Sequence, residues 1–183
     1  MKNLLSFITF SILVSLLSSC TKQIINKEND YVSLSERNVV QSIAKLDKRT
    51  KLEVEKVISA TAIYADFAKA VEDGYTNVLP FMPYVGNRII QEPPILEFNM
   101  LKPCFLIYEE TTNEIDLKLA GVGYMVSMKG TSGEPIPPPE GFYGDDDIWT
   151  ASSDDKYWVL HAWIIKNNPD GFFHFTNPES NHK

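Results

Sequence analysis

The spacing of apolar residues changes once along the chain, near Gly74, and this change constrains the fold more than any other feature. Before Gly74 the apolar residues recur at helical spacing, and from residue 102 onward they follow the pattern of β-strands. Helices followed by strands, without regular alternation between the two, are typical of α+β proteins. The sequence therefore predicts an α+β fold, in which an N-terminal helical pair packs on a small antiparallel sheet.

Two helices are expected before Gly74. The first begins after a capping serine, Ser33 or Ser35, and its apolar face consists of Val39, Val40, Ile43 and Leu46. The second is expected from about Lys51 to Asp73, with an apolar stripe made of Val54, Val57, Ile58, Thr61, Ala65, Ala68 and Val71. Gly74 then serves as the C′ residue that ends this helix. A short connection between two helices predicts an antiparallel pair.

The strands are expected later in the chain. Residues 102–110 and 114–129 are β-rich and separated by a turn-prone TTN, which predicts a hairpin, and residues 156–166 form a third strand. The proline-rich stretch between Gly74 and residue 102 is interpreted as loop with short extended pieces. A long Pro/Asp-rich insert, residues 129–155, precedes the last strand. It could be a lid or a docking surface, or a mobile surface loop, and its composition favours the last.

The N-terminus has the pattern of an export signal. A positive residue, Lys2, precedes an apolar run, and the ending Leu-Ser-Ser-Cys at Cys20 resembles the bacterial lipobox. The resemblance implies a signal peptide over residues 1–19 and a lipidated Cys20. Two or more acyl chains on this cysteine would anchor the protein stably to a membrane. Residues 20–33 then form a tether, 34–178 a single globular domain and 179–183 a polar tail.

This pattern predicts a location in the bacterial cell envelope. Thr21 follows the cysteine, which favours the outer membrane, while the periplasmic or external orientation stays open. Removal of the signal takes away Lys2 and no acidic residue, so the formal charge moves from −7 to −8. An acidic chain is a poor partner for nucleic acid. With Cys20 acylated, Cys104 cannot form an intramolecular disulfide, and its apolar neighbours predict that it is buried.

His161 is the candidate around which a binding site is predicted. Alternation along residues 156–166 places Trp158, Leu160, Ala162 and Ile164 on one face of the strand. The opposite face carries Tyr157, Val159, His161, Trp163 and Ile165. His161 is then either a hydrogen-bonded structural histidine or a ligand-binding group in a cavity, and the first interpretation is favoured. The candidate ligand-binding residues are His161, Trp163, Tyr157 and Asn168, the last in the turn that follows.

The run LHAWIIKNNPDGFFHFTNP (160–178), with GVGYMV (121–126) and PYVGN (83–87), resembles a family of uncharacterised bacterial and some fungal proteins. These proteins end in a Leu-His-x-Trp, Asn-Pro-x-Gly-x-Phe, Asn-Pro pattern, and the resemblance covers about Tyr64 to Pro178. Many relatives have a histidine near the position of Pro83 and Tyr84 and a glutamate at that of Gly123. The resemblance implies that, with His161, such a set could bind zinc or non-haem iron.

This chain keeps only His161 at the matching positions, so the resemblance implies that any such site has been lost, and no metal is predicted. Neither a Walker loop, a dinucleotide fingerprint, a CxxC nor an HExxH motif occurs, and no cofactor is expected. No catalytic residue is assigned. The acid run Asp145–Asp147 lacks the alternating spacing of a calcium loop.

Three functions fit these features. The favoured hypothesis is a lipid-anchored, non-catalytic envelope domain that binds a small molecule or an envelope protein, held to the membrane by its N-terminal lipid. The alternative is an enzyme, metal-dependent or otherwise, that uses His161 in a pocket covered by the 129–155 loop. A third is a structural or assembly protein that docks to an outer-membrane partner through an exposed apolar surface.

Overall fold

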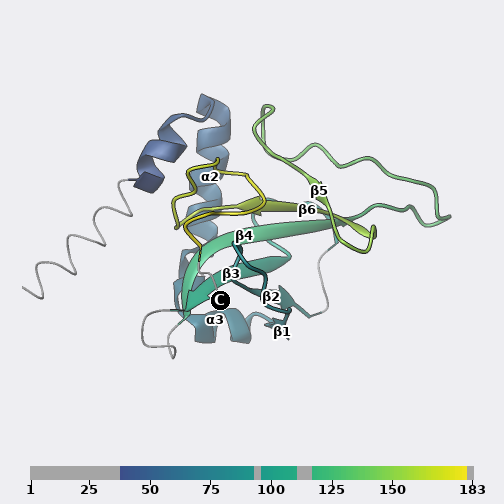
Figure 1. Ribbon diagram of the computed structural model, residues 1–183, viewed down its shortest axis with the longest axis horizontal. Helices are drawn as coiled ribbons and strands as arrows, with labels where there is room; N and C mark the ends of the chain where they lie inside the picture. The colour runs from purple at the N-terminus through teal and green to yellow at the C-terminus, as the bar shows by residue number, and fades with distance from the viewer. Residues whose placement is uncertain (1–37, 93–95, 111–116, 181–183) are drawn as a thin grey trace, which may run out of the picture. The chain divides into compact units, whose positions relative to one another are not determined.

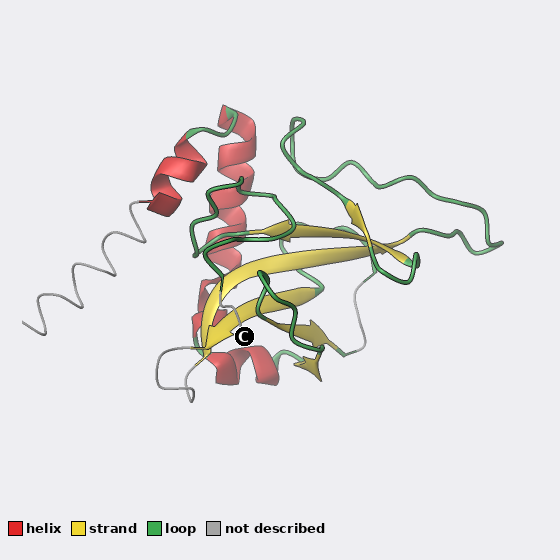
Figure 2. Ribbon diagram, viewed as in Figure 1, coloured by secondary structure: helices red, strands yellow, loops and turns green. Residues whose placement is uncertain are grey.

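The computed structural model describes residues 38–92, 96–110 and 117–180 of the 183-residue chain. Its contacts divide the chain into two units, residues 1–37 and 38–183. The first unit lies outside the described residues, and so do the predicted signal peptide, Cys20, the tether, the expected caps of the first helix and the tail from residue 181. The second unit carries an antiparallel sheet and a few helices, and the predicted α+β fold is confirmed (Figures 1 and 2).

The helical region is divided differently from the prediction. Residues 38–44 are helical, and they are followed by α2 (Lys48–Thr61), the 3₁₀ turn η1 (Ala62–Ala65) and α3 (Phe67–Glu72). The expected continuous helix from Lys51 to Asp73 is therefore wrong. It breaks because Asp66 has extended backbone angles and its side chain accepts a hydrogen bond from the Ala68 amide at 3.0 Å, which begins a new helix.

The break changes which residues face the core. The predicted stripe holds through Thr61, since Val54, Val57 and Thr61 are all fully buried. Beyond the 3₁₀ turn it fails, and Ala65, Ala68 and Val71 are exposed, as is Val40 in the first helical segment. Gly74 has a positive φ of 92° and follows the last residues of α3, which confirms its role in ending the helix.

The described strands form one antiparallel sheet in the order β1-β2-β3-β4-β6-β5. Their bounds are β1 Tyr75–Val78, β2 Asn87–Gln91, β3 Phe105–Glu110, β4 Leu117–Ser127, β5 Thr150–Ala151 and β6 Tyr157–Ala162. The predicted hairpin is confirmed as β3 and β4. Strands β1 and β2 lie in the stretch interpreted as loop with short extended pieces. They can form because prolines 80 and 83 fall in the connection between the two strands.

The sheet is buried on both faces, and alternate residues of β3 show the division. Leu106 and Tyr108 pack with Val54 and Val57 of α2, on the face that the helices cover. Their neighbour Phe105 points to the second face, together with Ile107, Ala120, Val159 and Trp163. No helix packs there among the described elements. The loop before β2 and the segment after β6 cover it instead, through Val85 and Phe175.

The last strand is shorter than predicted. β6 ends at Ala162, because the Ile164 amide donates to the Ala162 carbonyl at 3.1 Å and the Trp163 amide donates to Phe172 at 3.1 Å. The backbone therefore turns out of the sheet. His161 and Trp163 stay on the second face as expected, whereas Ile165 packs with the helix-side core, contrary to the predicted alternation.

The insert between β4 and β6 is tied to the rest of the domain at three places. At its base the Ile136 carbonyl accepts from Trp158 Nε1 at 2.9 Å. Further along, Phe142 is buried and the Tyr143 amide donates to Glu53 of α2 at 2.8 Å. Finally, β5 pairs with β6. The insert runs out beyond the end of β4 and returns toward α2 (Figure 1), so its second half is part of the packed structure and not simply a mobile loop.

Candidate functional site

His161 lies in a sealed aromatic cluster on the second face of the sheet. Its side chain is completely buried, on β6 directly opposite Gly123 of β4. The imidazole stacks on Phe175 with 4.5 Å between ring centroids and an interplanar angle of 13°. Phe105 and Trp163 approach it edge-on at 5.5 and 6.2 Å. The predicted aromatic neighbours of His161 are present, but their rings pack against the imidazole and fill the space around it.

The hydrogen bonding of this imidazole fixes its tautomer. Nδ1 lies 2.5 Å from the carbonyl oxygen of Phe175, and since a carbonyl only accepts, Nδ1 carries the proton. Nε2 is then the unprotonated nitrogen, and it is buried with no hydrogen-bond partner among the described residues. Burial lowers the pKa of His161 to about 4, with a smaller contribution from the charge of Arg88 and an opposing one from the Phe175 carbonyl. At neutral pH the ring is uncharged.

Of the positions that the family resemblance connects with His161, that of Gly123 is filled and Tyr84 has an exposed side chain. A Cβ atom at Gly123 would overlap the ring of Phe105, which therefore fills the place of a side chain at that position. Tyr84 has a positive φ of 63° and a side chain that is 47% exposed, and its carbonyl accepts from the Asn177 amide at 2.7 Å. In the described parts of the chain no group of three His, Cys, Asp or Glu residues could hold a metal ion.

The other predicted site residues are only partly brought together. Tyr157 lies at the margin of the His161 cluster and is half-buried. Trp163 donates from Nε1 to the His174 carbonyl at 2.8 Å, which holds the segment after the turn against the sheet. Asn168 lies elsewhere, in the turn. Its Nδ2 donates to the Thr176 carbonyl at 2.8 Å and its Oδ1 accepts from the Asp170 amide at 3.1 Å, so its side chain shapes the turn.

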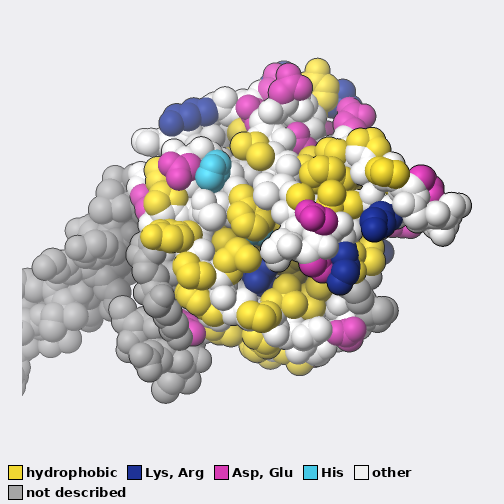
Figure 3. Space-filling model, turned by 45° about the vertical axis from the view of Figure 1, so that its right-hand side comes forward, with side chains coloured by type: hydrophobic (Ala, Val, Ile, Leu, Met, Phe, Trp, Pro, Cys, Tyr) yellow, Lys and Arg dark blue, Asp and Glu magenta, His cyan; other side chains and the backbone are white. Residues whose placement is uncertain are grey.

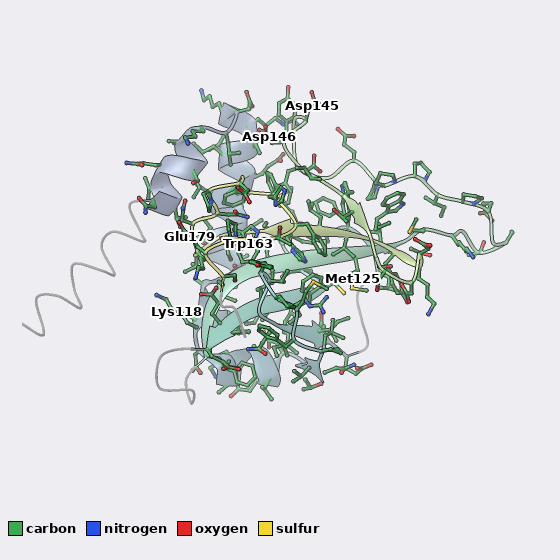
Figure 4. All side chains as sticks on the ribbon, in the orientation of Figure 1. Lys118, Met125, Asp145, Asp146, Trp163 and Glu179 are labelled. Atoms are coloured by element: carbon green, nitrogen blue, oxygen red, sulfur yellow. The ribbon has the colours of Figure 1, made fainter. Side chains whose placement is uncertain are left out.

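A concave site does occur, on the outer side of that turn. It is a cleft of about 560 Å³, within the range of about 300–1,000 Å³ that is usual for small-ligand sites. Three segments form its walls: residues 38–46, the insert at 146–148 and the turn at 167–174. The part of the insert that bears Asp145 and Asp146 lies near the start of α2 (Figure 4), where the bond from Tyr143 to Glu53 holds it.

The walls of the cleft are rich in hydrogen-bonding groups. Gln41, Ser42 and Asn167 are among the lining residues, and Ser42 donates from Oγ to Asn167 Oδ1 at 2.8 Å. This bond connects two walls and turns the amide nitrogen of Asn167 away from Ser42. His174 is half-buried at the cleft, with Nδ1 3.0 Å from the Thr176 carbonyl.

Charges of both signs line the same cleft. Lys45 directly follows the first helical segment, Asp146 belongs to the insert and Asp170 to the turn. All three are exposed, and within the described residues none of them forms an ion pair. Acidic, basic and apolar side chains are also interspersed on the face shown in Figure 3, without a continuous basic surface there. The cleft is thus a polar site of mixed charge.

Sequence reasoning found one residue of this cleft, Asn168, and missed the rest. The polar residues Gln41 and Lys45 do not belong to the apolar face predicted for the first helix, and Asp146 belongs to the acid run without calcium-loop spacing. Each of the three is exposed, and nothing in its local sequence marks it as part of a site. Their convergence depends on the return of the insert toward α2, which no local pattern indicates.

The chain matches no protein-family model, no curated protein and no solved structure. The family resemblance of its C-terminal motif therefore stays a prediction. Across the described residues, no helix is both long enough and apolar enough to cross a membrane.

Proposed function

We propose that this chain is a lipid-anchored protein of the bacterial cell envelope whose domain binds a small polar ligand without transforming it. The observation that carries the proposal is the cleft of about 560 Å³, in which amide, hydroxyl and charged groups from three segments converge. A few convergent polar groups in a concave site are what fixes a small ligand in place. The lipobox-like ending at Cys20 supports the anchored location.

The environments of the two described histidine side chains favour a binding role over catalysis. His161 is enclosed by rings, and its protonated nitrogen is already bonded to the Phe175 carbonyl. His174 reaches the cleft, but its Nδ1 lies within hydrogen-bond distance of the Thr176 carbonyl, and no carboxylate among the described residues is hydrogen-bonded to its ring. A general base needs to reach its substrate and to be oriented by a third group. Neither histidine has that environment.

The anchor is tested by labelling cells that express the full chain with an alkyne fatty acid. The wild-type protein is expected to carry the label and to sediment with membranes, whereas Cys20→Ser loses both properties. Cys104→Ser is the matched control, because Cys104 is buried just before β3 and its change should leave labelling intact. Equal labelling of Cys20→Ser and wild type would contradict lipidation at this residue.

Ligand binding in the cleft is tested on the full-length protein in detergent, by thermal unfolding with amino acids, short peptides and oligosaccharides. A ligand at 100 times its Kd stabilises the folded state by about 2.7 kcal/mol. Gln41→Trp places a large ring on a wall of the cleft and is expected to abolish this stabilisation. Thr131→Trp, on an exposed part of the insert outside the cleft, should preserve it. A ligand that stabilises Gln41→Trp as strongly as wild type would contradict the proposal.

A further inference from the structure

Charges of both signs are available in the cleft. Lys45 supplies a cation just after the first helical segment, while Asp146 and Asp170 supply carboxylates from the insert and the turn. Within the described part of the chain these three groups are not paired with one another or with other residues. Charged side chains that line one cavity yet stay unpaired are available to a ligand that carries both signs.

The neutral polar groups of the cleft match the peptide unit. Gln41 and Asn167 each carry an amide, which offers both donor and acceptor atoms. The Asn167 oxygen is occupied by Ser42, so its Nδ2 is the group left to donate. A peptide backbone presents carbonyl oxygens and amide hydrogens in alternation and can meet both kinds of group.

The apolar part of the lining separates peptides from sugars. Phe172 and Phe173 border the cleft, but they are 5% and 1% exposed, so neither offers an open ring face on which the C–H groups of a pyranose could stack. Leu46 and Ile148 line it as well, and Ile148 is 48% exposed. Aliphatic groups of this kind suit small apolar side chains.

We propose that the cleft binds a short peptide with free termini, whose carboxylate lies at Lys45 and whose ammonium group lies between Asp146 and Asp170. This inference rests on the proposed function, because it names the ligand class of the same cleft. Charge-assisted hydrogen bonds at both ends set the orientation of the peptide, and the amides of Gln41 and Asn167 meet its backbone.

The test is calorimetric titration of the full-length protein in detergent with four probes. These are tri-alanine, its N-acetylated form, its C-terminal amide and a trisaccharide of N-acetylglucosamine. Tri-alanine is expected to bind most tightly, and blocking either terminus should weaken binding about tenfold or more, since one charged contact is lost. The trisaccharide should not compete with tri-alanine.

Variants test which charged residues bind each terminus of the peptide. Lys45→Gln is expected to bind tri-alanine and its amide equally, because the carboxylate then has no partner. The double change Asp146→Asn with Asp170→Asn should likewise remove the difference between tri-alanine and its acetylated form. Lys118→Gln and Asp145→Asn are the matched controls, since both residues are exposed and lie outside the cleft lining (Figure 4). They should leave all four affinities unchanged.

The outcomes separate this inference from the proposed function. Capped and free peptides that bind equally, or a trisaccharide that binds while tri-alanine does not, would overturn the peptide assignment. If the peptide or trisaccharide that binds wild type no longer binds Gln41→Trp, the cleft remains a ligand site and the proposed function stands. If tri-alanine fails to bind wild type at millimolar concentration, the peptide assignment is overturned, and if no probe then distinguishes wild type from Gln41→Trp, the proposed function fails as well.

Discussion

Two histidines thirteen residues apart in one motif lie in opposite environments. His161 is on strand β6, and its side chain lies on the second face of the sheet, enclosed by Phe105, Trp163 and Phe175. His174 is in the turn region that follows, half-buried at an open cleft. The residue type is the same, so what decides the role is whether the element that carries it points into the core or away from it.

The two parts of the motif therefore have different roles. Trp163 and Phe175 close the second face of the sheet, while Asn168 and Asp170 shape the turn that borders the cleft. Changes on the sealed side should therefore alter the free energy of unfolding, whereas changes in the cleft should alter ligand binding. The following predictions are arranged from the largest expected effect on unfolding to the smallest.

Phe105→Ala should cause the largest loss of stability. It removes a buried ring that lies over Gly123 and against His161, and Phe→Ala changes in cores cost about 3–5 kcal/mol. Urea unfolding at pH 7 measures the loss. Tyr143→Ala removes an exposed aromatic ring and is expected to cost much less. A loss below about 1 kcal/mol in Phe105→Ala would mean that the sealed cluster is not packed as described.

The stability of the protein should fall as the pH is lowered from about 6.5 to about 4. The folded pKa of His161 is about 4 because of burial, below its ordinary value of about 6.5, so the unfolded chain binds a proton in this window and the folded chain does not. The native state thus loses about 3 kcal/mol relative to the unfolded state. Urea unfolding at a series of pH values measures it.

The histidine variants assign this pH dependence. His161→Asn keeps a donor for the Phe175 carbonyl but does not titrate, so its stability should fall less steeply with acid than that of wild type. His174→Gln is the control and should keep the wild-type slope, since His174 is outside the sealed cluster. Equal slopes in His161→Asn and wild type would show that the buried imidazole is not the group responsible.

Asn168→Ala should have an intermediate effect, because Asn168 lies where the two regions meet. The change removes a donor to Thr176 and an acceptor for Asp170, each in a part-buried bond, and the loss is expected to be about 1–3 kcal/mol. Asn99→Ala is the matched control. It removes a similar local bond, from the Leu101 amide, but in an exposed loop, and should cost less. Thermal unfolding of both variants measures the contrast.

The cleft charges should have the smallest effect on unfolding. Lys45→Gln and Asp170→Asn each change an exposed residue that has no ion pair among the described residues, so stability should stay within about 0.5 kcal/mol of wild type. Thermal unfolding without ligand checks this. A loss above about 1 kcal/mol would assign these residues to the structure of the fold and would weaken the contrast between the two regions.

The main lines of the fold could be predicted from local patterns. The hairpin of β3 and β4 has strong β-forming residues, and Gly74 occupies a position that requires a positive φ. The break at Asp66 was missed because the apolar spacing continues past it, while the aspartate can cap a new helix. Strands β1 and β2 fall in the stretch interpreted as loop with short extended pieces, but their pairing was not predicted. The prolines near them lie in the connection and leave the ladder intact.

The site was less predictable because it depends on residues far apart in sequence. Alternation along β6 correctly placed His161 and Trp163 on one face. Whether that face was hollow depended on Phe105, which belongs to another strand and occupies the space beside Gly123. In the same way, the cleft exists because the insert returns to α2, and the bond between Glu53 and Tyr143 spans 90 positions.

The covering of the second sheet face has a consequence for the order in which the chain folds. Asn177 donates to the Tyr84 carbonyl at 2.7 Å, and Ser180 reaches Val85 across 95 positions of sequence. These contacts cannot form until the chain is available through residue 180. A partial chain that lacks the C-terminal segment would therefore leave the aromatic surface around His161 uncovered.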